Sequence, residues 1–552
     1  MDSENYWRRF LIPVLFLFVG MAGVVAPYLT MRGLPGDLGD ARLNVYLLEH
    51  AFLVISGKLP TFLSAPFFYP WINTIGLSDT HWGTVPIYAL FRWAGGSPES
   101  AFAGWFCFGS LANFVATYLV NRKLGLRPVG ASLGAFLFAF SLPVIAQDGH
   151  VQLTYRLFIP LAFLSFSHYL KEKDPVWFGM ATLLISVQFL STFYMGFFLV
   201  FFLAVYGVVC FFESGEKGLS LSCRFRDRFV PASFSWHRIA LSVALVTAAL
   251  CLMGLVVVPY WQTKQLYGIE RHYSEIRRML PRLQSYLAGD RSLMWFSQWR
   301  AFSLLPSRNE HQLFMGIGAS VLFLCAITSK SFLEEKPLEK RFVTVLGCFF
   351  FWTLVVGGVS LYQGVAWLPG FSAVRAVTRV VLVLLFPAGF IVGRVVDEMK
   401  TKSFPLVSSS SVVLFFLVLI VSDSVLAEKA VTSCVEWKNR TSLLESRVGK
   451  WNKESVLVVA TQPHDFSTDL DAMSFSQAKG IKTMNGYSGA TPRGWVHFST
   501  CADVGKVLEA SRAFYANLHR PFPLKPENVI CVGFPEEDNG CASVLAPGEK
   551  KP

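Results

Sequence analysis

Residues 10–29 read "FLIPVLFLFVGMAGVVAPYL", twenty positions without a charged side chain. A helix of about 20 apolar residues is what the hydrocarbon core of a bilayer requires. The apolar part is too long for a secretory signal, and no clear small-residue cleavage pattern follows it. We therefore predict a retained first membrane-spanning helix.

Apolar segments of similar length recur along the chain. Of its 552 residues, 53% are hydrophobic and 16% are charged, and the mean hydropathy is +0.45. We predict an α-helical polytopic membrane protein with about 11 transmembrane helices. The predicted spans are 11–29, 100–120, 128–146, 156–170, 176–191, 194–212, 238–260, 311–328, 342–362, 379–397 and 405–424.

Basic residues gather in alternate short loops between these spans. Such loops stay in the cytoplasm, so the net charge of +12 reflects topology and does not suggest nucleic-acid binding. The first long loop, 30–99, and the C-terminal tail are then expected on the extracytoplasmic side, in a bacterium outside the inner membrane. The basic loops are "NRK" (121–123), "KEKD" (171–174), "RFRDR" (224–228), "KPLEKR" (336–341) and "DEMKTK" (397–402).

Two domains are predicted: a transmembrane domain over 1–424 and an extracytoplasmic α/β domain over 425–552. In the tail, "SVLVVATQ" (455–462) is typical of a buried strand, and the apolar spacing of 503–518 is typical of an amphipathic helix. The final "APGEKKP" is expected to be disordered.

Four cysteines fall in the predicted exterior tail. An even number in an oxidising space allows two disulfides in any of three pairings. No Cys or Cys/His spacing fits zinc, so we predict no such metal site. The four are Cys434, Cys501, Cys531 and Cys541.

The first exterior loop contains two apolar stretches too short to span a membrane. Residues 43–56 carry Glu49 and His50 among helically spaced apolar side chains, which predicts a helix lying along the membrane surface. "FFYPW" (67–71) is aromatic and stiffened by proline, as expected of an interfacial anchor.

Polar clusters recur where the chain meets the predicted outer boundary of the membrane. Ionisable groups near lipid are costly and usually line a cavity, so we expect one shared polar cleft. The clusters are Asp37/Asp40, Asp79/His81, "QDGHVQLTYR" (147–156), "RHYSEIRRMLPR" (271–282) and "LPGFSAVRAVTR" (368–379).

Five short motifs, in order along the chain, carry a resemblance to a known superfamily. They are "GDLGDARLN" (36–44), "SDTH" (78–81), "GHVQ" (149–152), "PGFSAVRAVTR" (369–379) and "NGYSGATP" (485–492). With the juxtamembrane acid and the long first loop, they resemble the GT-C glycosyltransferases, in particular a bacterial subgroup of poorly characterised GT-C-like membrane proteins. That pattern has Pro where this chain has Ala41, which leaves both acids in place.

The resemblance implies a transferase that takes sugars from polyprenyl-phosphate carriers. By analogy with the juxtamembrane acid of these enzymes, Asp40 is the candidate general base, accepting the proton of an acceptor hydroxyl as it attacks the anomeric carbon with inversion. Asp37 is a weaker catalytic candidate. The alternative for both is turn chemistry, for which Gly-Asp is common.

Other motif residues are candidates for substrate binding. Asp79 and His81 would orient reactants or, with Asp37, hold a divalent cation; a merely solvated role is the alternative. His150 and Gln152 suit sugar hydroxyls, against ordinary hydrogen bonding at a helix end.

Arg375 and Arg379 are four positions apart, so on a helix they would share one face and could clamp the lipid phosphate. The alternative is that they snorkel toward headgroups. Tyr487, in a glycine-rich turn, is a candidate for closing over the cleft.

We therefore predict a membrane glycosyltransferase whose partners are a polyprenyl-phosphate sugar, membrane lipids, and an exterior glycan, lipid or protein acceptor. No cofactor is certain, although a divalent cation is compatible with the acids. A transporter or lipid flippase is the first alternative, and a non-catalytic envelope-assembly protein is the second. The near absence of mid-span charges argues against transport.

Overall fold

The computed structural model describes residues 3–30, 33–213, 235–295, 300–368, 370–399, 410–534, 541 and 545. The basic loop 224–228, part of the 397–402 loop and the final "APGEKKP" lie outside the described residues. The chain divides into two compact units. Unit 1 comprises Met1–Thr30, Gly104–Leu255 and Glu270–Lys429, and unit 2 comprises Met31–Ala103, Val256–Ile269 and Ala430–Pro552.

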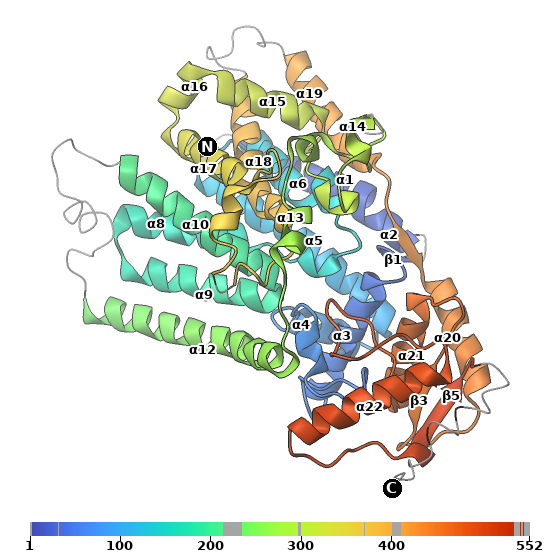
Figure 1. The fold of residues 1–552 in the computed structure, drawn as a ribbon. Helices are drawn as coiled ribbons and strands as arrows, with labels where there is room; N and C mark the ends of the chain where they lie inside the picture. The colour runs from blue at the N-terminus through green and yellow to red at the C-terminus, as the bar shows by residue number, and fades with distance from the viewer. Residues whose placement is uncertain are drawn as a thin grey trace. The chain divides into compact units, whose positions relative to one another are not determined.

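Unit 1 is helical, and each of the 11 predicted spans overlaps a helix (Figure 1). Six helices or helical runs are long and apolar enough to cross a membrane: Phe10–Leu29, Pro98–Lys123, Pro128–Ile145, Phe193–Glu213, Trp236–Tyr267 and Val377–Glu398. Three shorter apolar helices are Pro175–Ser191, Ile317–Thr328 and Ser410–Val425. The remaining two overlaps are α8 (Phe158–Glu172) and α17 (Pro337–Thr353).

Helices α6 (Pro128–Phe140) and α18 (Val381–Glu398) cross through glycines on both sides. Gly130 and Gly134 on α6 meet Gly393 and Gly389 on α18, and a Cβ at Gly134 would lie 2.8 Å from the Gly389 carbonyl oxygen. Small residues spaced by four let helix backbones approach closely, where dispersion and weak hydrogen bonds replace the hydrophobic effect that lipid cannot supply.

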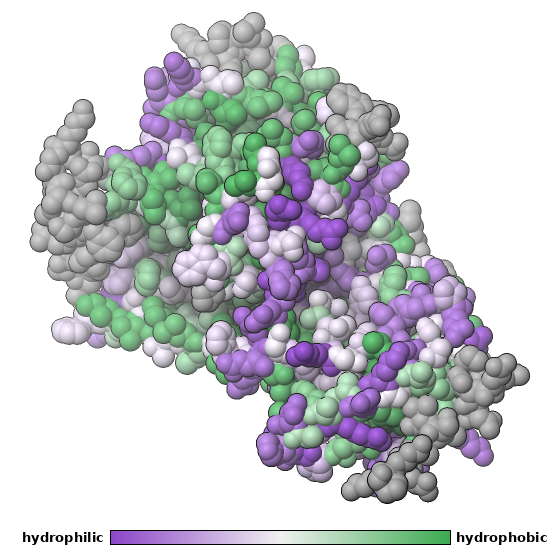
Figure 2. Space-filling model, viewed as in Figure 1, coloured by the Kyte–Doolittle hydropathy of each residue, from purple (hydrophilic) through white to green (hydrophobic). Residues whose placement is uncertain are grey.

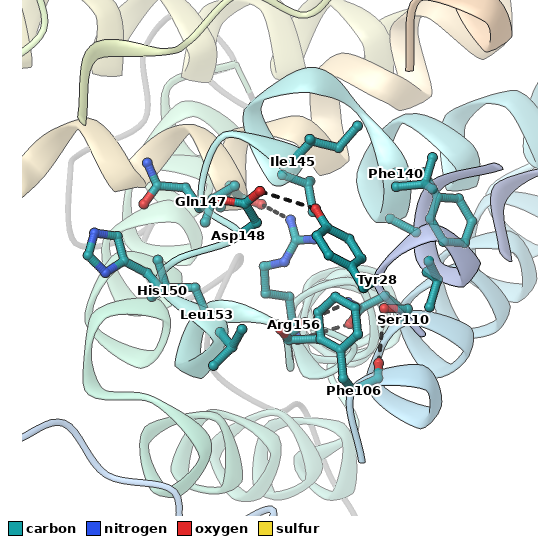
Figure 3. Close-up of a pocket in the computed structure, with 18 residues that line it drawn as sticks. Tyr28, Phe106, Ser110, Phe140, Ile145, Gln147, Asp148, His150, Leu153 and Arg156 are labelled. Atoms are coloured by element: carbon teal, nitrogen blue, oxygen red, sulfur yellow. Dashed lines mark hydrogen bonds between the residues drawn. The ribbon is translucent and has the colours of Figure 1, made fainter. Parts of the chain in front are cut away.

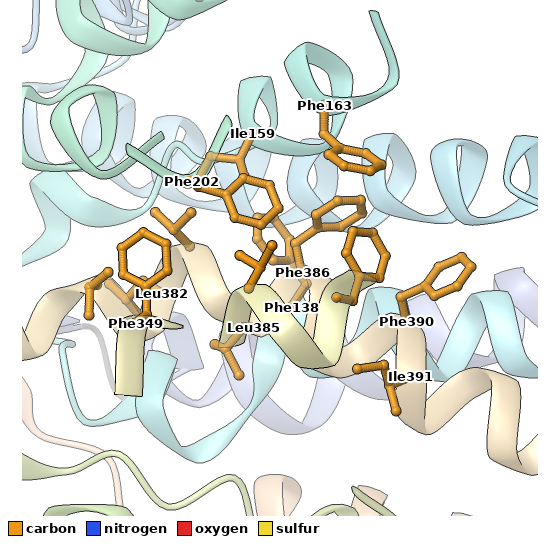
Figure 4. Packing of buried hydrophobic residues seen from close by; sticks show 14 of the residues in the cluster. Phe138, Ile159, Phe163, Phe202, Phe349, Leu382, Leu385, Phe386, Phe390 and Ile391 are labelled. Atoms are coloured by element: carbon orange, nitrogen blue, oxygen red, sulfur yellow. The ribbon is translucent and has the colours of Figure 1, made fainter. Parts of the chain in front are cut away.

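Aromatic side chains fill the space around this crossing. Phe386 on α18 packs against Phe163 of α8 with ring centres 5.3 Å apart, and Phe342 of α17 lies 5.1 Å from Phe163 (Figure 4). All three are fully buried. By contrast, α12 (Trp236–Tyr267) is hydrophobic on its exposed side, as Figure 2 shows, which is the distribution expected of a lipid-facing helix.

Unit 2 joins the first loop to the C-terminal residues through a small antiparallel sheet. Strand β1 (Gly33–Pro35) pairs with β2 (Val431–Ser433), with Leu34 opposite Thr432. A second sheet has the order β4–β3–β5 and is parallel: β3 (Val456–Val459), β4 (Lys482–Thr483) and β5 (Val529–Val532). The strand predicted within 455–462 is therefore confirmed.

Helices connect and cover the parallel strands, as parallel pairing requires. They are α20 (Cys434–Val448), α21 (Phe466–Lys479) and α22 (Cys501–Asn517). The helix predicted over 503–518 is confirmed by α22. Cys501 and Cys541 form a disulfide, whereas Cys434 and Cys531 are free, so the four cysteines form one bridge rather than two.

Two predictions for the first loop are wrong about where its apolar residues lie. Helix α3 (Asp40–Ile55) exists, but its residues 41–52 are all buried inside unit 2 rather than lying along a membrane surface. Its polar side chains are paired internally: Arg42 Nη2 donates to Asp471 Oδ1 at 2.6 Å, and Glu49 accepts from Arg92 Nε at 2.8 Å.

The "FFYPW" stretch is likewise core rather than anchor. Phe67 and Phe68 are fully buried and pack in one cluster with Met473 and Trp495 of the C-terminal residues. The Phe68 and Trp495 ring centres lie 4.9 Å apart, edge to face. The stretch is apolar, as predicted, but the side chains that cover it come from more than 400 positions later in the chain.

Candidate functional site

Asp40 lies at the first turn of α3, where Gly39 precedes the helix. Its Oδ1 accepts a hydrogen bond of 2.9 Å from the hydroxyl of Tyr487. The Tyr487 ring packs at 5.7 Å from that of Phe466 at the start of α21. Two of the predicted site residues, from the first and the last motif, are therefore in direct contact within unit 2.

Asp37 plays a different part from Asp40. It is exposed, and its Oδ1 accepts the backbone N–H of Gly39 at 2.9 Å, which is the hydrogen bond of an Asp turn. The structure thus gives Asp37 the role of shaping the loop that delivers Asp40 to the helix start.

His81 is joined to the same helix through Asn44. The Asn44 amide nitrogen donates to the Asp40 carbonyl oxygen at 2.6 Å, so its Oδ1 faces His81 Nε2, also at 2.6 Å. Burial lowers the pKa of His81 to about 3, so the imidazole is neutral and donates its Nε2–H to Asn44.

Asp79 caps its own turn by accepting the Thr80 N–H at 2.8 Å. Next to it, the hydroxyls of Ser78 and Ser488 are 2.6 Å apart. Asp79 and His81 also line a small cavity with His50 and Trp82. Three motifs, "GDLGDARLN", "SDTH" and "NGYSGATP", therefore contact one another in all three combinations, and we call this arrangement the motif ring.

The cation-binding prediction for Asp37, Asp79 and His81 has no matching geometry. Within the part of the chain that the structure describes, these three do not place their ligand atoms within 4.8 Å of one another. The His81 nitrogen that faces α3 is already used as a donor to Asn44.

The predicted residues of unit 1 form a second group, centred on Glu310. Arg379 binds Glu310 through two parallel hydrogen bonds, Nε to Oε2 at 3.0 Å and Nη2 to Oε1 at 2.6 Å. His150 Nε2 lies 3.2 Å from Glu310 Oε1, and Gln152 follows in the same short 3-10 turn. Burial by itself raises the pKa of Glu310, but the Arg379 charge and the hydrogen bonds from His150 and Arg379 outweigh it and hold that pKa well below its usual range.

Arg375 and Arg379 do not share a helix face, so that prediction is wrong. Arg375 lies in irregular backbone, and Arg379 is in the 3-10 turn Val377–Val380. Arg375 Nη1 reaches Glu275 Oε1 at 3.3 Å, and Arg271 Nη1 reaches the same oxygen at 3.2 Å. Two partly exposed guanidinium groups thus gather around one carboxylate, which leaves a surplus of positive charge there.

A cavity in unit 1 adjoins the "QDGHVQLTYR" motif (Figure 3). Its wall includes Asp148, whose carboxylate accepts from the Tyr28 hydroxyl and from Arg291 Nη2, both at 3.2 Å. Arg156 also lines it; this guanidinium is fully buried, donates to the Leu382 carbonyl oxygen at 3.4 Å and stacks over Phe138.

Sequence reasoning missed the carboxylates that pair with the motif arginines. Glu310 stands in "RNEH", immediately before a predicted span, and an acid at that boundary was a signal of the same kind as Asp40. Glu275 sits among the basic residues of 271–282, where charge alternation was the available signal.

Comparisons with known proteins identify the architecture. No family model and no curated protein matches the chain. Among solved structures, the apo oligosaccharyltransferase of Archaeoglobus fulgidus superposes with a TM-score of 0.50 at 11% identity, over 88% of this chain and 65% of that one. Arabinofuranosyltransferase AftD from mycobacteria gives a TM-score of 0.45 at 11% identity, over 84% of this chain and 30% of that one.

The chain thus spans less than two thirds of the length of these solved structures, and at 11% identity the likeness concerns the fold. It covers most of the present chain, including helices that are long and apolar enough to cross a bilayer. The chain is therefore a polytopic helical membrane protein with a GT-C-like fold.

Proposed function

We propose that the chain is a membrane glycosyltransferase that moves a sugar from a polyprenyl-phosphate donor to an extracytoplasmic acceptor. The acceptor class comprises lipid-linked glycan, lipid A, polysaccharide and protein. The observation that carries the proposal is the motif ring of unit 2, in which Asp40 contacts Tyr487 and is linked through Asn44 to His81.

Asp40 is the proposed general base. The acceptor oxygen attacks the anomeric carbon, its proton passes to the Asp40 carboxylate, and the bond to the donor phosphate breaks with its electron pair remaining on the phosphate. Displacement from the side opposite the leaving group inverts the configuration. The Tyr487 hydrogen bond fixes one carboxylate oxygen, so that the base is oriented before substrate arrives.

The other members of the ring are proposed to orient reactants. Neutral His81 holds Asn44, and Asn44 holds the first turn of α3, so both residues help to fix the position of Asp40. Asp79 and His81 also line the neighbouring small cavity, whose wall is partly apolar.

The donor phosphate is proposed to bind unit 1 through Arg375. Arg375 shares Glu275 with Arg271 and is 35% exposed, so charge and access are both available for an anion. The guanidinium of Arg379 pairs with buried Glu310, and Glu310 also contacts His150. Arg379 is therefore proposed to position His150 and Gln152 for sugar hydroxyls.

The Cys501–Cys541 disulfide supports an extracytoplasmic position for unit 2, because disulfides persist in oxidising compartments. The fold supports the reaction class, since an oligosaccharyltransferase shares it.

The test uses membranes that contain the wild type or Asp40→Asn, supplied with labelled polyprenyl-phosphate sugars. We expect membranes with the Asp40→Asn variant to lose label transfer by about a hundredfold or more, since removing a general base costs that much. Glu445→Gln, a charge change at an exposed ion pair of unit 2, is the matched control and should transfer normally. Equal labelling by Asp40→Asn and wild type at equal protein levels would overturn the proposal.

A further inference from the structure

Two histidines and one aspartate converge in the C-terminal part of unit 2, and none of the three belongs to the motif ring. His464 Nε2 lies 3.1 Å from Asp469 Oδ2, and His497 Nδ1 lies 2.9 Å from the same oxygen. All three potential ligand atoms lie within 4.8 Å of one another. From this geometry we propose a binding site for a divalent transition-metal ion of the zinc type, independent of the proposed transfer reaction.

The ligand set and its spacing fit such an ion. Imidazole and carboxylate are ligands of zinc, with bonds of about 2.0–2.1 Å, so tetrahedral neighbours stand about 3.3 Å apart. The two nitrogen–oxygen distances are within a few tenths of an ångström of that value. Without a metal, one carboxylate oxygen must accept from two imidazoles at once, and an ion would replace both of those protons.

Asp469 is held in place by a residue of the fifth motif. Its side chain is buried, and its other oxygen, Oδ1, accepts from Asn485 Nδ2 at 2.8 Å. Asn485 is in turn anchored to β3, where Oδ1 accepts the Val459 N–H and Nδ2 donates to the Val459 carbonyl oxygen, both at 2.8 Å. Such outer hydrogen bonds orient a metal-binding carboxylate and raise its affinity.

The two histidine segments are tied to each other beside the site. Gln462 Nε2 donates to the Ser499 carbonyl oxygen at 2.8 Å, and the Ser499 hydroxyl donates to the Thr461 carbonyl oxygen at 3.3 Å. These contacts bring together His464, which precedes α21, and His497, which precedes α22.

The exposed sides of the site permit entry and adjustment. The side chains of His464 and His497 are 29% and 46% exposed, while that of Asp469 is 2% exposed. Their ring centres are 3.7 Å apart, so coordination at normal bond lengths requires the rings to splay by about 1 Å. With three protein ligands, at least one position remains for water.

The test measures zinc directly in the full-length protein in detergent. Purified wild type is incubated with zinc chloride, dialysed and analysed for metal by mass spectrometry, beside His464→Ala and His497→Gln. His168→Ala is the matched control, because His168 is a similarly exposed histidine of unit 1 and, among the residues that the structure describes, it pairs with one acid, Glu172.

We expect one zinc ion per chain in wild type and in His168→Ala, and none in the two site variants. Cobalt in place of zinc should give a visible absorption band in wild type and in the control, and no band in the site variants. Thermal unfolding of each metal-free variant should match wild type, which separates ligand loss from misfolding. Absence of zinc from wild type, or equal zinc in wild type and both site variants, would overturn the proposal.

Discussion

The hydroxyl of Tyr487 donates a 2.9 Å hydrogen bond to the carboxylate of Asp40, which stands 447 positions earlier in the chain. A hydrogen bond to a charged group is worth about 1.5–3 kcal/mol. In the proposed reaction, that contact holds one oxygen of the base in place and so orients the carboxylate toward the acceptor hydroxyl.

Replacing Tyr487 by Phe removes that donor and keeps the ring. We expect turnover to fall by about tenfold with little change in KM, because the carboxylate loses its orientation but the substrate contacts remain. Steady-state transfer of labelled sugar measures both constants. Tyr69→Phe is the control. The described hydrogen bond of the Tyr69 hydroxyl goes to a backbone carbonyl oxygen, that of Pro523. If the Tyr487→Phe and Tyr69→Phe variants have the same turnover number, the Tyr487–Asp40 hydrogen bond does not contribute to catalysis.

Glu310→Gln removes the carboxylate that pairs with the buried guanidinium of Arg379. Breaking a buried pair by removing one partner costs about 3–5 kcal/mol, so thermal unfolding in detergent should begin at a clearly lower temperature. The comparison is Glu275→Gln, whose ion pairs are partly exposed and worth about 0–1 kcal/mol. Similar shifts for both variants would mean that the Arg379 pair contributes no more than a surface contact.

Gly134→Ala tests the crossing of α6 and α18. The added methyl carbon would lie 2.8 Å from the Gly389 carbonyl oxygen, so the helices must separate. We expect a loss of about 1–3 kcal/mol, the usual cost of overpacking, seen as a lower unfolding temperature. Gly347→Ala, on α17, has nothing within 4 Å of the new carbon and should be neutral or slightly stabilising because alanine favours helix. Equal effects at the two glycines would contradict close packing as the cause.

His81 predicts how the stability of unit 2 depends on pH. Its pKa is about 3 in the fold and about 6.5 when unfolded, so between these values the unfolded chain binds more protons and stability falls as pH falls. From pH 7.5 to pH 5 the loss from this residue is about 2 kcal/mol. Buried His50, with a pKa of about 4, adds to it in the same direction. Chemical unfolding followed at both pH values should show a smaller pH effect in His81→Gln; an undiminished effect would place the titration elsewhere.

Local patterns predicted the helices, β3 and α22, because hydrophobic periodicity is a property of neighbouring residues. They failed for α3 and "FFYPW", which are apolar because they are core and not because they touch lipid. The sequence of residues 40–71 does not indicate that Met473 and Trp495 cover these apolar side chains in the fold.

The residues of the candidate site also fall into two groups: those that the sequence predicted and those that it did not. Motif spacing led to Asp40, His81 and Tyr487, and the structure brings these into one ring. Motif spacing could not reveal that Arg379 pairs with Glu310, or that Asp469 contacts two histidines. These pairs depend on where separate segments of the chain come together in the fold.

The pairing of β1 with β2 also sets an order of events during biosynthesis. Residues 33–35 emerge from the ribosome well before their partners 431–433, which come almost 400 residues later. Until that late segment is made, the loop that carries Asp40 has neither its sheet neighbour nor Tyr487. A nascent or truncated chain that lacks these segments would thus hold the proposed base in an unfinished loop, and competence for chemistry would arrive only once Tyr487 has been made.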